Sequence, residues 1–282
     1  MDCQASRNGS DLTATCEPPP EPTATEEAIA TLSLIVPVYN EAENLPALVA
    51  EFEQHVPEPF VCYVVYDFDG DTTVPVARRL AERRGWLRLE KNRFGGGVVG
   101  ALRTGFEAAG QGPALVVMAD LSDDLRCVPE MLRLYREGHR VVCPSRYMPG
   151  GRQIGGPRLK KMMSRFAGKS LRLLVGFPTS DATNNFRLYD AGLVREMGIE
   201  SRGGFEVALE LTAKAFRRGV AIAEVPATWR DRTAGQSRFR IWKWLPKYLG
   251  WYFYALVGFP KRPNRGSYAP VDGDLPDVGN GG

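Results

Sequence analysis

The sequence predicts an α/β protein built on a mostly parallel sheet. Over the first half of its 282 residues, short apolar runs alternate with stretches long enough for helices, as in successive β-α-β units. The run Leu115-Val116-Val117-Met118 is apolar at every position, which is typical of a strand covered on both faces. The hydrophobic fraction of 44% and the charged fraction of 24% are those of an ordinary globular protein with a core of its own.

The elements follow one another in a regular order. The predicted strands are Leu32–Val38, Phe60–Tyr66, Trp86–Lys91, Ala114–Met118, Arg140–Pro144 and Ala221–Val225. The helices expected after most of them are Leu45–His55, Val74–Arg84, Val98–Ala109 and Val128–Glu137. From Arg146 onward the pattern changes, because a loop rich in glycine and proline leads into a long helix. The helices predicted in this half are Arg158–Val175, Ala191–Met197 and Phe205–Arg218.

The first predicted strand ends abruptly and turns into a helix at Pro37-Val38-Tyr39-Asn40-Glu41. Ligands of open α/β sheets bind beyond the carboxyl ends of the strands, and Pro37 cannot donate to the sheet ladder. Tyr39 offers a flat ring and Glu41 a hydrogen-bond acceptor, a pair suited to a ring and a sugar hydroxyl. An ordinary β-to-α turn is the alternative interpretation of this segment.

Carboxylates follow three neighbouring strands. Glu41 follows the first, Asp67-Phe68-Asp69-Gly70-Asp71 follows the second, and Ala119–Asp124 follows the strand that begins at Ala114. Clustered carboxylates suit a hard cation such as Mg²⁺ or Mn²⁺, which prefers oxygen ligands and shares them with substrate phosphates. Aspartates are also common in loops and helix caps, but their alignment after successive strands favours a ligand site. The glycine-rich loop Asn92–Gly100 lies between these acids, and such a loop allows backbone amides to approach phosphates.

The inventory of side chains excludes several catalytic classes. The two histidines, His55 late in a helix and His139 in a turn, leave no histidine triad and no H-E-x-x-H zinc site. The five cysteines are widely spread and form no C-x-x-C pair, so neither a disulfide framework nor a zinc knuckle is indicated. This pattern of cysteines fits a protein in a reducing, cytoplasmic setting. The net charge of +3 says little about partners.

Two segments of the second half are candidates for a membrane surface. Arg152–Arg172 holds seven Lys and Arg residues and no Asp or Glu, with a basic stripe beside an apolar one at helical spacing. Phe239–Phe259 carries three tryptophans, but its uncharged part, Tyr248–Phe259, has only 12 residues, where a spanning helix needs about 20. Both patterns favour helices lying in the membrane interface. The alternatives are a solvated helix face above a normal core and a C-terminal helix packed on the sheet.

Six motifs occur in a characteristic order. They are V-P-V-Y-N-E at Val36–Glu41, Y-D-F-D-G-D-T at Tyr66–Thr72, A-D-L-S-D-D at Ala119–Asp124, P-S-R-Y at Pro144–Tyr147, D-A-T-N-N-F-R-L-Y at Asp181–Tyr189 and R-T-A-G-Q-S-R-F at Arg232–Phe239. With these motifs the chain resembles the family 2 glycosyltransferases of the GT-A fold, closest to the polyprenol- or dolichol-phosphate mannosyltransferases. The resemblance covers roughly Leu32–Trp244 and implies a GT-A sheet with a C-terminal amphipathic helical extension.

The resemblance also implies roles for individual residues. It assigns catalytic roles to Asp120, which matches the metal-binding second acid of a D-x-D motif, and to Arg146, which would meet the acceptor phosphate. The residues that it places on substrates are Pro37, Tyr39 and Glu41 at the base and ribose, Asp67 at the base, Ser122 beside the metal, Lys160 at the acceptor phosphate, Asp181, and Arg232 and Arg238 at the donor diphosphate.

The chain departs from the family pattern at three places. Met118 stands where the first acid of the D-x-D motif is expected, which removes one carboxylate ligand. Asp123 and Asp124 offer compensation, although Asp124 equally suits a cap of the next helix. Tyr66 replaces an aspartate, and Asn184-Asn185 stands where Ser-Gly is usual.

The resemblance therefore implies a metal-dependent, inverting hexosyltransferase at the cytoplasmic face of a membrane. The donor would be GDP-mannose or a UDP-hexose, the cofactor Mg²⁺ or Mn²⁺, and the acceptor a dolichyl, undecaprenyl or other polyprenyl phosphate. The expected division is a disordered segment over 1–30, the glycosyltransferase domain over 31–238, an interfacial aromatic helix over 239–260 and a disordered tail over 261–282.

Three other functions fit parts of the sequence. The same donor chemistry with a glycolipid, glycan or protein acceptor is one. A non-catalytic protein that binds nucleotide sugars or lipids is another. Met118, at the position of the missing acid, is the reason to consider it. A nucleic-acid binder rests on the basic helix alone, and the lack of interleaved aromatic residues there counts against it, so no nucleic-acid partner is expected.

Overall fold

The computed structural model describes residues 31–57, 59–204, 206–231 and 241–257, with only the backbone described over 241–244. The segments predicted to be disordered, 1–30 and 261–282, lie outside the described residues. So do two predicted site residues, Arg232 and Arg238.

The elements alternate as the sequence predicts. The strands are β1 (Leu32–Pro37), β2 (Phe60–Tyr66), β3 (Leu87–Lys91), β4 (Pro113–Val116), β5 (Val141–Ser145), β6 (Arg152–Ile154), β7 (Arg187–Asp190), β8 (Ile222–Pro226) and β9 (Thr228–Arg230). The helices are α2 (Leu45–His55), α3 (Thr73–Ala81), α4 (Val98–Ala109), α5 (Val128–Arg136), α6 (Arg158–Val175), α7 (Ala191–Met197), α8 (Val207–Arg217) and α9 (Ile241–Val257), with a 3-10 turn η1 (Leu125–Cys127).

Seven strands form the central sheet in the order β3-β2-β1-β4-β7-β5-β8, while β6 and β9 pair separately. The pairs β1–β2, β2–β3, β1–β4 and β5–β8 are parallel, and β7 is antiparallel to β4 and β5. The predicted mostly parallel sheet is confirmed. The sequence analysis missed β6, β7 and β9, and it extended the fourth strand to Met118, whereas β4 ends at Val116.

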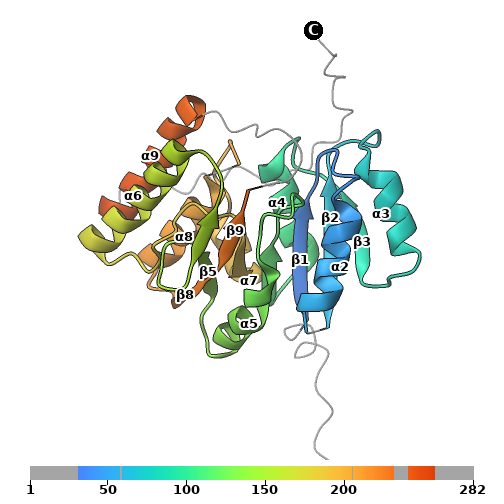
Figure 1. Cartoon of the computed structure of the whole chain (residues 1–282), viewed down its shortest axis with the longest axis horizontal. Coiled ribbons are helices and arrows are strands. Elements are labelled where there is room, and N and C mark those ends of the chain that lie inside the picture. Colours follow the sequence, from blue (N-terminus) through green and yellow to red (C-terminus); the bar gives the residue numbers. More distant parts are fainter. Residues whose placement is uncertain (1–30, 58, 205, 232–240, 258–282) are drawn as a thin grey trace, which may run out of the picture.

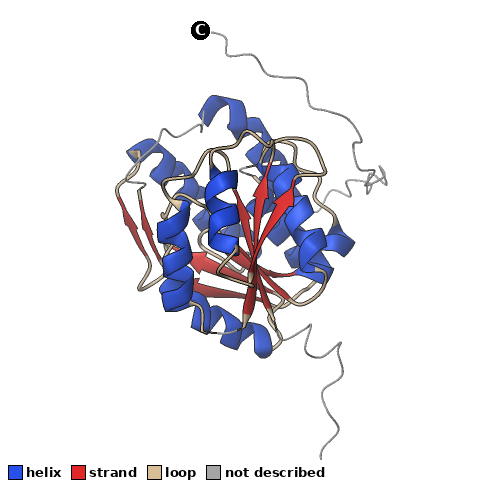
Figure 2. Ribbon diagram, turned by 90° about the vertical axis from the view of Figure 1, so that its right-hand side faces the viewer, coloured by secondary structure: helices blue, strands red, loops and turns tan. Residues whose placement is uncertain are grey.

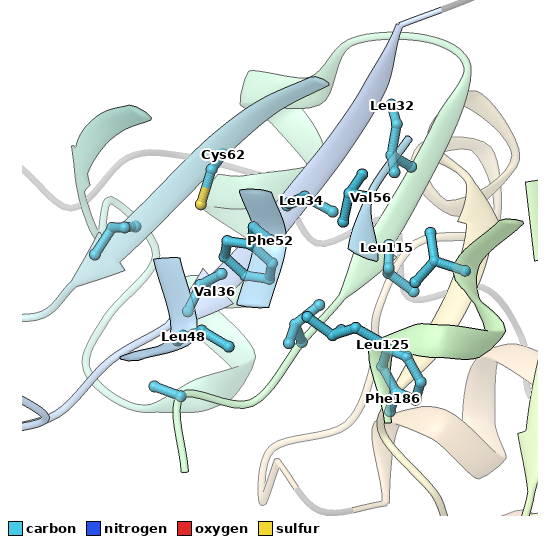
Figure 3. Close-up of a cluster of buried hydrophobic side chains, with 14 of the residues drawn as sticks. Leu32, Leu34, Val36, Leu48, Phe52, Val56, Cys62, Leu115, Leu125 and Phe186 are labelled. Atoms are coloured by element: carbon cyan, nitrogen blue, oxygen red, sulfur yellow. The ribbon is translucent and has the colours of Figure 1, made fainter. Parts of the chain in front are cut away.

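Helices cover both faces of the sheet (Figure 2). Alternate residues of β1 point to opposite faces, as the period of a strand requires. Leu32, Leu34 and Val36 belong to one buried cluster with residues of α2, α3 and α5, among them Leu48 and Phe52 of α2 (Figure 3). Ile35 packs on the other side, against α4 and residues of α7 and α8. The buried cysteines Cys62 and Cys143 lie in β2 and β5, as predicted for small apolar residues.

The order of the strands predicts a crevice beside β1. The chain moves from β1 to β2 and β3 on one side, then returns so that β4 lies on the other side of β1. The loops that follow β1 and β4 therefore diverge, and a crevice between such loops is the usual ligand site of an open α/β sheet. Asp120 belongs to the loop that follows β4.

A third layer lies beyond the sheet on the β8 side, where α6 and α9 run next to each other and α9 contacts α8 (Figure 1). Leu171 of α6, Leu209 and Ala213 of α8, and Trp251 and Ala255 of α9 form its buried core. The predicted C-terminal helix is thus present, but it packs on α6 and α8 rather than directly on the sheet.

Gly168 determines how closely α6 approaches the segment before β7. A methyl group built on its Cα would lie 1.9 Å from the carbonyl oxygen of Ser180. Gly168→Ala is therefore expected to lower the free energy of unfolding by about 1–3 kcal/mol, the usual cost of an extra methyl in a packed site. Urea unfolding measures this loss. Ala167→Gly, at the neighbouring position, is the control for a change of helix propensity alone.

Candidate active site

A buried carboxylate joins the loops that follow β1 and β2. Asp71, with 1% of its surface exposed, accepts the backbone N–H of Asn40 at 3.1 Å and that of Thr73 at 2.7 Å. The hydroxyl of Thr73 accepts the N–H of Glu41 at 2.8 Å. These bonds hold Asn40 in a left-handed conformation with φ of 55°, which asparagine tolerates better than most residues. Asp71 is therefore a structural acid that fixes the rim of the crevice.

The predicted donor residues of β1 lie on this rim. Pro37 is buried as the last residue of β1, and the ring of Tyr39 is 44% exposed with its centroid 5.7 Å from that of Phe68. The Oε2 atom of Glu41 accepts a hydrogen bond from the side-chain amide of Asn44 at 2.7 Å. The rim thus presents an open aromatic ring next to an oriented carboxylate.

Asp67 holds the glycine-rich loop in place. Its Oδ1 accepts the side-chain N–H of Asn92 at 2.7 Å, and its Oδ2 accepts the backbone N–H of Gly97 at 2.7 Å. Gly97 has φ of 98°, a conformation that glycine adopts without a steric penalty. The suggestion that this loop offers its amides to a phosphate is thus wrong for Gly97, whose N–H is taken by Asp67.

Four of the predicted site residues line a single cavity of about 700 Å³: Asp120, Ser122, Arg146 and Lys160. The cavity starts at the loop that follows β4 and extends between α6 and α9. Its wall does not include Pro37, Tyr39, Glu41 or Asp67, which lie on the loops of the neighbouring strands β1 and β2.

The loop that follows β4 folds back on itself. Leu121 has φ of 59°, an uncommon conformation for leucine, and the N–H of Ser122 donates to Oδ1 of Asp120 at 3.2 Å. The backbone N–H of Met118 donates to Oδ2 of Asp123 at 3.2 Å. The carboxylate of Asp123 therefore lies beside the backbone of Met118, the position where the first acid of the D-x-D motif is missing.

The two successive acids of this loop have different surroundings. Asp123 lines the cavity, and its burial together with the nearby charge of Asp120 raises its pKa to about 8. Asp124 caps η1 by accepting the N–H of Arg126, and it also binds the guanidinium of Arg126 at 2.8 Å. Of the two alternatives for Asp124, the helix cap is confirmed.

The oxygens of Asp120, Ser122 and Asp123 form a donor set of the kind that Mg²⁺ and Mn²⁺ prefer. Among the described residues no group of three or more His, Cys, Asp or Glu side chains gathers as a metal site. Two carboxylates and a hydroxyl in one cavity still fit a cation that takes its remaining ligands from substrate phosphates and water.

Arg146, at the start of the loop that follows β5, is fixed by Asp181. Its Nε donates to Oδ2 of Asp181 at 2.6 Å and its Nη2 to Oδ1 at 2.8 Å, and the Asp181 side chain is 0% exposed. Burial by itself would lower the pKa of Arg146, but the charge and hydrogen bonds of Asp181 raise it above its ordinary value. In the described part of the chain, Nη1 of Arg146 has no hydrogen bond, and the residue lines the cavity. Asp181 therefore lies behind Arg146 and orients it.

Several residues that the sequence analysis did not assign complete the wall. Tyr147 and Trp229 place their rings 5.0 and 5.9 Å from the guanidinium carbon of Arg146, within the range of cation–π attraction. Gln153 accepts the hydroxyl of Tyr147 at 2.9 Å, and Lys161 lies beside Lys160 in the cavity wall. Tyr147 was visible in the P-S-R-Y motif, but β9, which carries Trp229, has only three residues and gives no sequence signal.

The helices α6 and α9 carry most of the exposed large apolar side chains. Of the ten large hydrophobic side chains that are exposed in the described residues, five lie on α6 and three on α9. The eight are Leu159, Met162, Phe166, Leu173, Leu174, Leu249, Phe253 and Val257. On α6 only Gly168 and Leu171 are buried, so the alternative of a solvated face above a normal core is wrong for this helix. We call these eight side chains the α6–α9 face.

The comparisons with known proteins decide the family. The family model described as "Glycosyl transferase family 2" matches residues 33–198, which is more than half of the chain. The chain belongs to glycosyl transferase family 2. The undecaprenyl-phosphate mannosyltransferase of Micrococcus luteus is 32% identical over 72% of this chain and 85% of its own. The polyprenol monophosphomannose synthase of Mycolicibacterium smegmatis is 28% identical over 73% of this glycosyltransferase and 79% of its own chain.

Solved structures confirm the GT-A fold. Glucosyl-3-phosphoglycerate synthase from Mycobacterium tuberculosis, in complex with UDP, superposes with a TM-score of 0.60 at 19% identity, over 87% of this glycosyltransferase and 88% of that chain. A mannosyltransferase from Pyrobaculum calidifontis, in complex with GDP-Man and Mn²⁺, also has a TM-score of 0.60, at 18% identity over 82% and 65% of the two chains. In the part of the glycosyltransferase that the structure describes, no helix is long and apolar enough to cross a membrane.

Proposed function

We propose that this glycosyltransferase transfers a hexose, with inversion, from a nucleotide sugar to a polyprenyl phosphate. The observation that carries the proposal is the single cavity that contains both the acid for the donor side, Asp120, and the cation for the acceptor side, Arg146. The relatives from M. luteus and M. smegmatis are named for mannosyl transfer to, or mannose on, such lipids. This supports mannose as the first sugar to test.

On the donor side, Tyr39 and Glu41 bind the base and ribose at the rim of the crevice, and Asp67 orients the loop beside them. Asp120, Ser122 and Asp123 would hold Mg²⁺ or Mn²⁺. When bound, the cation supplies electrostatic stabilisation of the negative charge that grows on the leaving nucleoside diphosphate. Arg232 and Arg238, outside the described residues, are proposed to approach the same diphosphate.

On the acceptor side, a phosphate oxygen forms the new bond to the anomeric carbon of the sugar. The bond from that carbon to the nucleoside diphosphate breaks, and the electron pair leaves with the diphosphate. A phosphate monoester is already anionic near neutral pH, so it needs positioning and a cationic site rather than a strong general base. Arg146 and Lys160 provide that site.

Arg146→Lys is expected to raise the KM for the acceptor about tenfold and to leave the KM for the donor unchanged. The reason is that lysine offers a point charge without the planar fork that Asp181 holds. Steady-state kinetics with each substrate varied separately measures this split. Arg140→Lys is the matched control, because Arg140 also pairs with an aspartate, Asp190, at 3.0 Å. A change in the donor KM alone would contradict the assignment of Arg146.

We also propose that the α6–α9 face lies on the cytoplasmic surface of the membrane. Exposed basic residues, among them Arg165 and Lys169, stand beside its apolar side chains on α6, and this combination suits anionic lipid headgroups. In this arrangement residues 31–238 form the catalytic domain, and α9 is the interfacial helix of the segment 239–260.

Charge reversal on α6 tests this orientation. Arg165→Glu/Lys169→Glu is expected to reduce cosedimentation with vesicles that contain phosphatidylglycerol at least about tenfold, because each basic residue near the surface contributes about 1 kcal/mol. Arg78→Glu/Arg79→Glu, two exposed arginines of α3, is the matched control with the same change of net charge. Equal losses in both variants would refute the orientation.

A donor and acceptor screen tests the function itself. Purified protein is incubated with radiolabelled GDP-mannose or UDP-glucose, undecaprenyl phosphate and Mg²⁺ or Mn²⁺, and the lipid extract is analysed for labelled sugar. Label in the lipid phase that requires the cation supports the proposal. Label that appears only in glycan, protein or glycolipid supports another acceptor, and donor binding without any transfer or hydrolysis supports a non-catalytic protein.

A further inference from the structure

The pairing of β4 with β7 places Asn185 beside Met118. The two strands are antiparallel, and their register, continued past both strand ends, sets Val117 opposite Phe186 and Met118 opposite Asn185. Val117 and Phe186 belong to one buried cluster, as the continued register requires. Met118 and Asn185 both line the cavity. Asn185 therefore lies next to the position where the first acid of the D-x-D motif is missing.

The segment Thr183–Asn185 connects the two charged parts of the cavity, and all three of its residues line the wall. At one end, the hydroxyl of Thr183 accepts a hydrogen bond from Nη2 of Arg146 at 3.4 Å. At the other end, Asn185 is beside the start of the acidic loop that follows β4. In the proposed reaction the anomeric carbon passes from the donor diphosphate to the acceptor phosphate, so the hexose lies between the acids and Arg146. The hexose therefore lies against this segment.

Two of the three side chains in the segment are already engaged. Thr183 accepts the guanidinium hydrogen bond described above. The amide of Asn184 donates to the carbonyl oxygen of Pro144 at 3.2 Å, and its oxygen accepts the N–H of Phe186 at 3.3 Å. The carboxamide of Asn185 is only partly buried and makes no hydrogen bond to any residue that the structure describes. Because Ser-Gly is usual in the family at these two asparagines, the carboxamide of Asn185 is an addition to the family pattern.

We infer that Asn185 hydrogen-bonds a hydroxyl group of the transferred hexose and so helps to select the donor sugar. A carboxamide offers both a hydrogen-bond donor and an acceptor, and a sugar hydroxyl can use either. A polar group placed to bind a substrate hydroxyl discriminates against a sugar that lacks it, because the group is then left without a partner. This inference rests on the proposed function and adds a residue that reads the sugar itself.

Donor analogues that lack one hydroxyl test the assignment without any transfer. Calorimetry in the presence of Mg²⁺ gives the dissociation constants of GDP, of GDP-mannose and of its analogues deoxygenated at C2, C3, C4 or C6 of the sugar. UDP, UDP-glucose and the corresponding deoxy analogues form a second series. For the wild-type protein, loss of one particular hydroxyl is expected to weaken binding about tenfold. In Asn185→Ala the same loss is expected to have no further effect, which marks a direct contact in a double-mutant cycle.

Two further variants keep the comparison balanced. Asn185→Gly restores the usual family residue and is expected to behave as Asn185→Ala does. Asn184→Ser is the matched control, because it restores the usual residue at the neighbouring position. It is expected to lower the midpoint of urea unfolding, since the hydrogen bond to Pro144 is lost, and to keep the wild-type dependence on every hydroxyl.

The failure of this assignment can be told from the failure of the proposed function. If the Asn185 variants respond to every analogue as the wild type does, Asn185 does not read the sugar, while the proposed transfer stands. If Asn185→Ala weakens the binding of GDP as much as that of GDP-mannose, the side chain serves the nucleotide or the cation, and the inference is again wrong. If neither GDP-mannose nor UDP-glucose is bound or consumed, the proposed function fails and the role of Asn185 fails with it.

Discussion

Asp120→Asn is expected to lower kcat at least about 10³-fold and to leave the protein folded. The carboxylate of Asp120 lines the cavity, and the backbone N–H of Ser122 donates to it. Asparagine keeps an oxygen for that hydrogen bond and has almost the same volume, so the loop loses little stability. The substitution does remove the negative charge that would bind a divalent cation beside the leaving diphosphate.

The measurement is the rate of product formation at saturating donor and acceptor, together with far-UV circular dichroism and the midpoint of urea unfolding. Asp124→Asn is the matched control, because Asp124 lies in the same loop but is paired with Arg126 at 2.8 Å. Since Asp124 also caps η1, the substitution is expected to change stability by about 0.5–2 kcal/mol and to keep most of the activity. If Asp120→Asn transfers the sugar at a rate near that of the wild type, the proposed mechanism is wrong.

Elements with a long, regular pattern could be predicted from the sequence. The helices α2, α4, α6 and α7 have the predicted bounds, and β2 does as well. The strands that were missed have three or four residues each, and β7 carries Arg187, whose side chain is fully buried. A short segment with a charged residue looks like a loop, because the burial of that residue depends on acceptors elsewhere in the fold, here the carbonyl oxygen of Ala208, 21 positions away.

The candidate site could be predicted in its residue types but not in its connections. The sequence placed Asp67, Asp71 and Asp120 after successive strands, and the structure agrees. It could not show that Asp71 is buried and accepts the backbone N–H of Asn40, or that Asp181 lies behind Arg146, because both facts depend on residues more than 30 positions apart. Periodicity likewise gave the apolar stripe of α6, whereas its exposure depends on how α6 packs beside α9.

Asp123→Asn is expected to lower the affinity for Mn²⁺ and the kcat/KM for the donor by about 100-fold. The protein has Met118 where a first acid of the D-x-D motif is expected, and the N–H of Met118 donates to the carboxylate of Asp123 at 3.2 Å. Asp123, five residues later in the sequence, therefore places a carboxylate beside Met118 at the end of β4. A bound divalent cation would favour the ionised form of Asp123 despite its raised pKa. Loss of one of two carboxylate ligands is then expected to have an effect of this size, comparable to the upper range for altered metal surroundings.

Restoring the family pattern provides the decisive comparison. Met118→Asp introduces a carboxylate at the position where the motif has one, so Met118→Asp/Asp123→Asn is expected to recover much of the Mn²⁺ affinity that Asp123→Asn alone loses. Binding of Mn²⁺ in the presence of GDP, followed by electron paramagnetic resonance, reports the affinity independently of turnover. The interaction between the two positions follows from the double-mutant cycle. If Asp123→Asn binds Mn²⁺ as tightly as the wild type, Asp120 and the substrate phosphates are sufficient for the cation, and Met118 marks a true loss of one ligand.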